Sequence, residues 1–123
     1  MQNHNDTRLL VIGGGPAGHS AATVAATIGA QVTVIEDKVI GGAAHLWDCI
    51  PSKAMVASSM RISAIRNAGR LGIDEVGPVH LDMGVLSDHL HSISSKIESS
   101  MVDLLDSQGV EMIRGRGRLT GVC

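Results

Sequence analysis

The hydrophobic pattern near the start of the chain predicts a strand, a helix and a second strand in succession. Residues 9–12 are a short apolar run that three glycines end, which is typical of a fully buried strand. From about 16 to 28, small and apolar side chains recur at helical spacing, and a proline suits the first turn. Residues 32–35 are apolar or β-branched and end at two acidic residues, so we expect a second buried strand there.

Two longer helices are predicted further along the chain. The first follows Pro51, whose ring restricts the backbone that leads into the helix. Ser52 is its expected N-cap, and the helix is expected to run to about Arg66. The second is the clearest amphipathic segment, from about 83 to 107, with Asp82 able to cap its start. We expect the apolar stripe of this second helix to lie in the core: Leu86, Leu90, Ile93, Ile97, Met101 and Leu104.

Weaker patterns fill the remaining segments. Residues 73–81 predict a loop or a weak strand, and residues 110–113 predict a third strand after the glycine that ends the second helix. Residues 116–119 are expected to begin an antiparallel hairpin. The succession of strand, helix and strand at the start favours an α/β fold.

Composition argues against several classes of function. The chain has 123 residues, a net charge of −2 and 44% hydrophobic residues, which fits one soluble domain or a piece of one. Trp47 is the single aromatic residue, which argues against a base-stacking surface for nucleic acid. Residues 9–35 carry no charge, but their glycines and polar side chains argue against a membrane span or a signal peptide. Two cysteines, Cys49 and Cys123, do not make the framework of a secreted domain, so a reducing, cytoplasmic compartment is expected.

A glycine-rich sequence between the first strand and the first helix matches the G-x-G-x-x-G pattern of dinucleotide sites. Gly13 permits the turn, Gly15 admits a phosphate to the backbone, and Gly18 lets the helix and the strand pack closely. Free N–H groups at the helix start favour a pyrophosphate, and Glu36, 18 residues beyond Gly18, is placed to hold a ribose hydroxyl. The alternative is a strand-to-helix turn that binds nothing. The expected cofactor site therefore comprises Gly13, Gly15, Pro16, Ala17, Gly18, Glu36 and Asp37.

A second motif, at residues 41–53, reads Gly-Gly-Ala-Ala-His-Leu-Trp-Asp-Cys-Ile-Pro-Ser-Lys. It resembles the flavin-proximal segment of the flavoprotein disulfide reductases, the family of dihydrolipoamide dehydrogenase, glutathione reductase and mercuric reductase. The family pattern G-G-T-C-x-N-x-G-C-x-P-S-K is matched in register by Gly41, Gly42, Cys49, Pro51, Ser52 and Lys53. The resemblance implies a Rossmann-like FAD-binding domain, with βαβ order and a three-layer parallel sheet with helices. It also implies that FAD is the nucleotide and that the cofactor site extends to Gly41, Gly42, Ala43, Lys53 and Gly117, the last by the adenine.

Three departures from the family pattern bear on the chemistry. Ala44 stands where the family has its first redox cysteine, Leu46 where it has asparagine, and Asp48 where it has glycine. Because a thiol relay needs two cysteines, the disulfide of the family cannot form here. The motif is similar to a branch of NAD(P)H quinone reductases that lack the pair. This resemblance implies hydride transfer from NAD(P)H to FAD, followed by two-electron reduction of a quinone-like small acceptor.

The same resemblance assigns two residues to flavin chemistry. Lys53 would lie near the reactive flavin nitrogen, where its charge favours the reduced, anionic ring; alternatively, it is an ordinary surface lysine. Cys49 would lie beside the ring, either as a stabilised thiolate or as an inert, buried small hydrophobe. The histidines show no metal-ligand spacing, so no metal site is expected. Three alternating arginines, expected on one side of a strand, suggest a phosphate or nucleic-acid patch, but a solvated face, or a surface near the FAD pyrophosphate or near further domains, is favoured: Arg114, Arg116 and Arg118.

The resemblance also implies parts that residues 1–123 do not contain. They are a second fingerprint for NAD(P)H, a later FAD segment and a C-terminal dimerisation domain. We therefore interpret the chain as the N-terminal part of the FAD/NAD(P)-binding domain of a larger, homodimeric oxidoreductase, inactive by itself. The alternatives are a dihydrolipoamide dehydrogenase-like enzyme, a pyridine-nucleotide transhydrogenase-like enzyme, a stand-alone FAD-binding module and a pseudoenzyme without a redox role.

Overall fold

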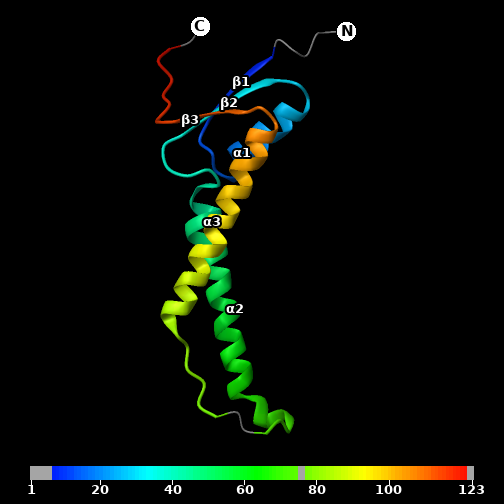
Figure 1. Cartoon of the computed structure of the whole chain (residues 1–123), viewed down its shortest axis with the longest axis vertical. Helices are drawn as coiled ribbons and strands as arrows, with labels where there is room; N and C mark the ends of the chain where they lie inside the picture. The colour runs from blue at the N-terminus through cyan, green and yellow to red at the C-terminus, as the bar shows by residue number, and fades with distance from the viewer. Residues whose placement is uncertain (1–6, 75–76, 122–123) are drawn as a thin grey trace.

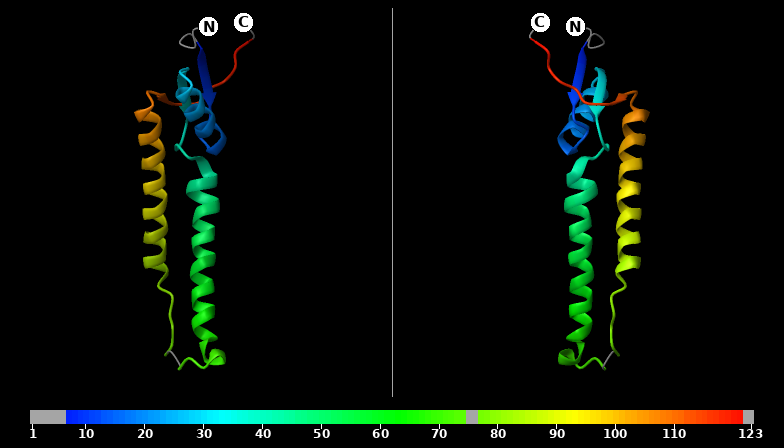
Figure 2. Two further views of the ribbon diagram at one scale, coloured as in Figure 1. Left: turned by 90° about the vertical axis from the view of Figure 1, so that its right-hand side faces the viewer. Right: turned by 90° about the vertical axis from the view of Figure 1, so that its left-hand side faces the viewer.

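The computed structural model describes residues 7–74 and 77–121 (Figure 1). Its elements are β1 (Arg8–Ile12), α1 (Pro16–Thr27), β2 (Gln31–Glu36), η2 (Ala44–Asp48), α2 (Cys49–Arg66), η3 (Ala68–Leu71), α3 (Met83–Ser107) and β3 (Glu111–Arg114). The sheet and α1 lie at one end of the molecule, and α2 and α3 extend from it as a long helical hairpin (Figure 2). The predicted succession of strand, helix and strand is confirmed, as are both long helices and the third strand.

The three strands form a parallel sheet in the order β1–β2–β3. The last pairs of the two ladders are Ile12 with Ile35 and Glu36 with Arg114. Because parallel strands end at the same edge, the glycine turn after β1, the acidic end of β2 and the segment after β3 meet there. The predicted α/β class is thus confirmed, and the sheet brings three candidate segments together.

The core lies on one face of the sheet. Val32 and Val34 alternate onto this face, and both are buried. Ala22 of α1 and Leu105 of α3 pack against them, together with Val110 just before β3. The small side chain of α1 at this contact lets its backbone lie close to the strands. Both helices therefore anchor on the same side of the sheet.

The opposite face of the sheet is largely open. Leu10, Ile12 and Ile113 point to it and are 57%, 49% and 45% exposed. The expected third layer is therefore not formed by the described residues, because no helix among them packs over these side chains. Apolar strand residues on both faces are typical of a parallel sheet that is covered on both sides.

The start of α2 differs from the prediction. The helix begins at Cys49, three residues before Ser52, and continues directly from the π-helical turn η2. Ser52 does not act as an N-cap, because its Oγ donates to the Cys49 carbonyl oxygen at 3.1 Å. The predicted end of the helix at Arg66 is confirmed. None of the residues of α2 is buried, so this helix is held mainly through its ends and through α3.

The long helix α3 confirms its predicted cap and corrects its predicted core stripe. Asp82 Oδ1 accepts hydrogen bonds from the backbone N–H groups of Gly84, at 2.8 Å, and Val85, at 3.1 Å. Leu104, predicted as core, is 41% exposed, whereas Leu105 is fully buried. Successive residues of a helix are separated by roughly 100° around its axis. At this end of α3 the side chain that faces the sheet is therefore Leu105 and not its neighbour Leu104.

The predicted hairpin at residues 116–119 is wrong. β3 ends at Arg114, and the described chain beyond it contains no strand. The segment instead crosses the open face of the sheet, where Gly117 passes the Ile12 side chain. As a result, Arg114, Arg116 and Arg118 do not share one strand. The described parts of residues 73–81 form a loop, as predicted, and no helix within the described ranges is long and apolar enough to cross a membrane.

Candidate functional site

The turn between β1 and α1 is held tightly against the end of β2. The N–H of Gly13 donates to the Ile35 carbonyl oxygen at 2.8 Å, and the N–H of Gly14 donates to Glu36 Oε2 at 2.7 Å. Gly13 has a φ of +103°, which residues with a side chain rarely adopt. A Cβ on Gly18 would collide with the Gly13 carbonyl oxygen. The close approach of α1 to this turn therefore requires glycine at both positions.

The start of α1 presents backbone donors to open space. Gly15 is its N-cap, no side chain caps the helix, and the first turn, which begins with Pro16 and Ala17, contains no acidic residue. A Cβ on Gly15 would meet nothing within 4 Å, so the space next to the N-cap in the Cβ direction is free. Uncapped N–H groups and the helix dipole favour an anionic group such as a phosphate at this point.

Glu36 is bonded through both of its carboxylate oxygens. Its Oε2 accepts from Gly14 N at 2.7 Å, and its Oε1 accepts from Lys38 N at 2.8 Å. Each oxygen keeps a further acceptor position, so the fixed carboxylate can also accept from a sugar hydroxyl. Sequence reasoning missed Gly14, because the pattern treats it as variable. A Cβ there would lie 2.7 Å from Ile40 Cδ1.

A cavity of about 180 Å³ opens at this edge of the sheet. Residues from the ends of all three strands line it: Ile12, Gly13, Ile35, Glu36, Asp37, Gly115, Arg116 and Gly117. The N–H of Gly115 donates to the Glu36 carbonyl oxygen at 2.9 Å, which holds the segment after β3 beside β2. A Cβ on Gly117 would lie 3.2 Å from the Ile12 side chain, so a larger residue would narrow the cavity.

Asp37 and Arg116 form an ion pair at the rim of this cavity. Arg116 Nη2 and Nε donate to Asp37 Oδ2 at 2.9 and 3.2 Å. The hydrogen bond from Arg116 holds the pKa of Asp37 below its ordinary value of 3.8. Because the folded pKa is below the unfolded one, the pair stabilises the fold above pH 3.8, and this contribution is lost as the pH falls through the lowered pKa.

Replacing Arg116 by alanine is expected to raise the pKa of Asp37 towards 3.8. The contribution of this pair, which is small because the pair is exposed, should then be lost at all pH values above 3.8, neutrality included, while stability below the lowered pKa of Asp37 stays the same. The side-chain carboxyl of Asp37 can be followed by NMR during an acid titration. Arg114→Ala is the matched control and should leave the pKa of Asp37 where it is. An unchanged Asp37 titration in Arg116→Ala would contradict the assignment.

Gly41 and Gly42 close around the first glycine turn. Both have left-handed backbone angles, with φ of +107° and +65°. The N–H of Gly41 donates to the Gly14 carbonyl oxygen at 2.8 Å, and a Cβ on Gly42 would lie 2.9 Å from Gly15 Cα. The two glycine motifs, which are separate in the sequence, therefore form one continuous structure.

The rest of the second motif forms the turn η2 and the start of α2. Ala43 is the N-cap of η2, and Ala44 is its first residue. Cys49 and Lys53 lie four residues apart on one side of α2, and both are exposed. The alternative of Cys49 as a buried hydrophobe is therefore wrong for this structure. Cys49 is free, and Cys123 lies outside the described residues.

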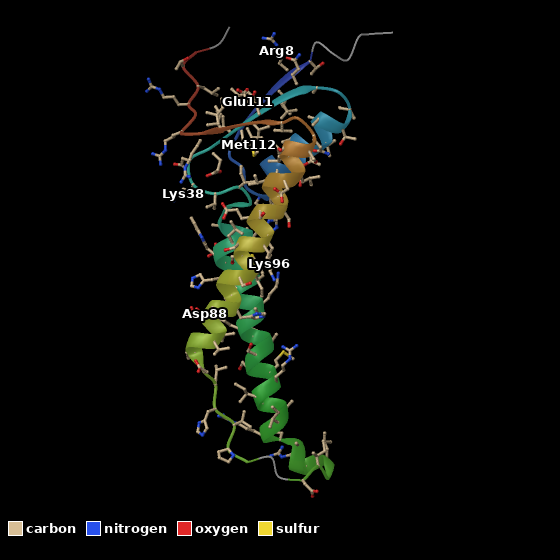
Figure 3. All side chains as sticks on the ribbon, in the orientation of Figure 1. Arg8, Lys38, Asp88, Lys96, Glu111 and Met112 are labelled. Atoms are coloured by element: carbon tan, nitrogen blue, oxygen red, sulfur yellow. The ribbon has the colours of Figure 1, made fainter. Side chains whose placement is uncertain are left out.

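A cation–π contact lies where the sheet meets the helical hairpin. Lys38, labelled in Figure 3, follows β2, and its Nζ lies 5.7 Å from the centroid of the Trp47 ring. Trp47 belongs to η2 and is 54% exposed. Such a contact is favourable even at an exposed position, so it restrains the indole beside the turn. Sequence reasoning missed this pair because the two residues are not related by a helical or strand spacing.

The geometry fits an extended nucleotide cofactor. An uncapped helix start faces open space, a bonded carboxylate lies beside it, and a cavity follows along the sheet edge. The glycines along this path leave the backbone open to close approach. The residues predicted for the phosphates, ribose and adenine thus lie along one edge, and the candidates for flavin contact begin α2 nearby.

Comparison with known proteins gives an independent result. Residues 7–123 match the family model described as pyridine nucleotide-disulphide oxidoreductase. Among curated proteins, an NAD(P)H dehydrogenase (quinone) of Mycobacterium tuberculosis is 38% identical over 117 residues, covering 92% of this chain and 24% of that protein. A dihydrolipoyl dehydrogenase of Zymomonas mobilis is 33% identical over 121 residues, covering 98% of this chain and 25% of that protein.

A solved structure agrees with the fold. The crystal structure of LpdA from Mycobacterium tuberculosis superimposes with a TM-score of 0.81 at 38% identity, covering 94% of this chain and 25% of that one. The chain thus spans about a quarter of the length of these relatives.

Proposed function

Because the chain belongs to the pyridine nucleotide-disulphide oxidoreductase family, whose members include the enzymes matched above, we propose that it forms the N-terminal, FAD-binding part of a larger NAD(P)H-dependent reductase. The proposed acceptor is a quinone or a similar small molecule, reduced without a thiol relay. We propose further that the complete enzyme is a homodimer in the cytoplasm. The relatives are about four times as long as this chain, which supports the proposal that the complete enzyme is larger.

The proposed cofactor contacts follow from the geometry of the edge. The N–H groups at the start of α1, beyond Gly15, would hold the pyrophosphate. Glu36 would accept from a ribose hydroxyl, and the backbone at Gly117 would lie against the adenine. Bound FAD supplies a ring that accepts a hydride from NAD(P)H. On the exposed side of α2, the cation of Lys53 would stabilise negative charge on that ring.

One observation carries the choice of acceptor: Ala44 occupies the position of the first redox cysteine. The structure holds Cys49 as a free, exposed thiol, five residues beyond Ala44. Exchange with a disulfide substrate needs a second thiol to resolve the mixed disulfide, and position 44 supplies none. The name of the Mycobacterium tuberculosis relative, NAD(P)H dehydrogenase (quinone), supports the same choice.

The proposal is tested by comparing acceptors with the complete reductase. We expect a yellow protein that oxidises NADH or NADPH with a soluble benzoquinone and does not do so with oxidised lipoamide. A dihydrolipoyl dehydrogenase serves as the positive control for lipoamide. Turnover of lipoamide with no turnover of the quinone would contradict the proposal, and purification without any flavin would contradict the cofactor assignment.

The variant Ala44→Cys gives a matched comparison. It restores both cysteine positions of the family pattern. The variant therefore supplies the second thiol of a relay but does not create a binding site for lipoamide. Titration of free thiols before and after reduction is expected to reveal an oxidisable pair in this variant and none in the natural protein. An oxidisable pair in the natural protein would contradict the absence of a thiol relay.

A further inference from the structure

The turn η2 is π-helical, and a side chain of α3 bonds to its backbone. The N–H of Cys49 donates to the Ala44 carbonyl oxygen, which is an i→i+5 bond of π-helical type. In the same register, the Leu46 carbonyl oxygen would take its bond from residue 51, but Pro51 has no N–H. Leu46 itself is buried, with 4% of its surface exposed. The π-helical pattern therefore cannot continue to the Leu46 carbonyl oxygen.

A serine of α3 bonds to this carbonyl oxygen. Ser94 Oγ donates to the Leu46 carbonyl oxygen at 2.9 Å, across 48 residues of sequence. Other serines of α3 behave differently: Ser100 and Ser107 donate to carbonyl oxygens of their own helix, those of Lys96 and Leu104. A bond within the helix is the usual local choice of a helical serine. Ser94 therefore forms a tertiary bond at the point where the π-helical pattern cannot continue.

Two further contacts join the same helix to the nucleotide-binding edge. Met101 Sδ lies 3.0 Å from where a Cβ on Gly41 would be, and the Met101 carbonyl oxygen accepts from His19 Nε2 at 3.2 Å. Met101 lies two turns beyond Ser94, and Lys96, labelled in Figure 3, marks the part of α3 between them, where α3 passes α2. One rigid helix thus contacts α1, the second glycine pair and η2.

We propose that Ser94 is a positioning residue, which holds the π-helical register of η2 and through it the orientation of Cys49 and Lys53 at the start of α2. Because η2 runs directly into α2, a change of register in η2 rotates and shifts the first turn of that helix. α2 has no buried residue of its own to resist such a rotation. Ser94 does not touch the proposed cofactor in this assignment, and it acts only through the backbone of η2.

Two measurements on the complete protein test the positioning role of Ser94 without any activity assay. In Ser94→Ala, amide hydrogen exchange in residues 44–50 is expected to become roughly tenfold faster, while exchange in β1 and β2 stays unchanged. The rate at which Cys49 is alkylated should change in the same variant. Mass spectrometry of the peptide that contains Cys49 measures this rate. Ser94→Thr, which keeps the hydroxyl, should restore both values. Ser92→Ala removes an exposed hydroxyl from the same helix and should change neither.

The outcomes separate positioning from general stability. Unchanged exchange and alkylation in Ser94→Ala would overturn the proposal, as would a uniform acceleration of exchange throughout the chain. A third measurement rests on the proposed function: the absorption spectrum of bound flavin should shift in Ser94→Ala and return in Ser94→Thr. If no flavin binds to any variant, the proposed function fails, while the exchange and alkylation results still decide the role of Ser94.

Discussion

Replacing Gly18 by alanine is expected to destabilise the fold by about 3 kcal/mol, because the new methyl group overpacks a closed contact. The Cβ would collide with the carbonyl oxygen of Gly13 and would lie 3.2 Å from Val11 Cγ1. Both neighbours belong to the strand and turn against which α1 packs, so neither can move without opening the sheet edge. We expect FAD to be lost with the fold. Urea unfolding of the protein measures the first effect, and the flavin content after purification measures the second.

Gly15→Ala is the matched control for this prediction. A Cβ at Gly15 would meet nothing within 4 Å, and its φ of −68° is one that alanine adopts readily. The free energy of unfolding should therefore stay close to that of the natural protein. Affinity for FAD should nevertheless fall, because the methyl group projects into the space assigned to the pyrophosphate. Natural stability in Gly18→Ala, or equal destabilisation of both variants, would contradict the packing argument.

Replacing Glu36 by glutamine is expected to weaken FAD binding about 100-fold, which corresponds to about 3 kcal/mol. Glutamine keeps a single carbonyl oxygen, so it cannot accept from both Gly14 N and Lys38 N. Its amide NH₂ would face one of these donors, and the charge-assisted bond to the ribose would be lost. Fluorescence titration of the apoprotein with FAD measures the dissociation constant.

Glu111→Gln provides the comparison for Glu36→Gln. Glu111 lies at the other end of the sheet, is exposed and accepts from Thr33 Oγ1 at 2.9 Å. Its replacement makes the same change of charge and should leave the affinity for FAD unchanged. An equal loss in both variants would mean that net charge, rather than the position of the carboxylate, governs binding.

The sequence predicted those parts of the fold whose signals are local. The apolar run at residues 9–12 lies within β1, and the run at 32–35 lies within β2. The amphipathic pattern at 83–107 has the same limits as α3, because a capping aspartate and a helix-ending glycine bound it. The glycine spacing placed the tight turn between β1 and α1 correctly.

The remaining features depend on contacts between distant segments. The π-helical turn η2 is bonded by Ser94, which lies 48 residues away from Leu46, and no periodicity in residues 44–48 indicates it. The burial of Leu105 rather than Leu104 depends on the angle at which α3 meets the sheet. The role of Gly14 arises from its bond to Glu36, a contact that a pattern with a variable second position does not express.

The position of Trp47 gives this chain a built-in optical probe. A chain without tyrosine or phenylalanine absorbs and emits in the near ultraviolet mainly from this one indole. Within residues 1–123, its emission therefore reports the solvation of η2 and the proximity of Lys38, rather than an average over several aromatic residues. A flavin bound near the start of α2 would receive excitation energy from this indole. Quenching of the Trp47 emission would then measure how far the ring lies from the turn, without any added label.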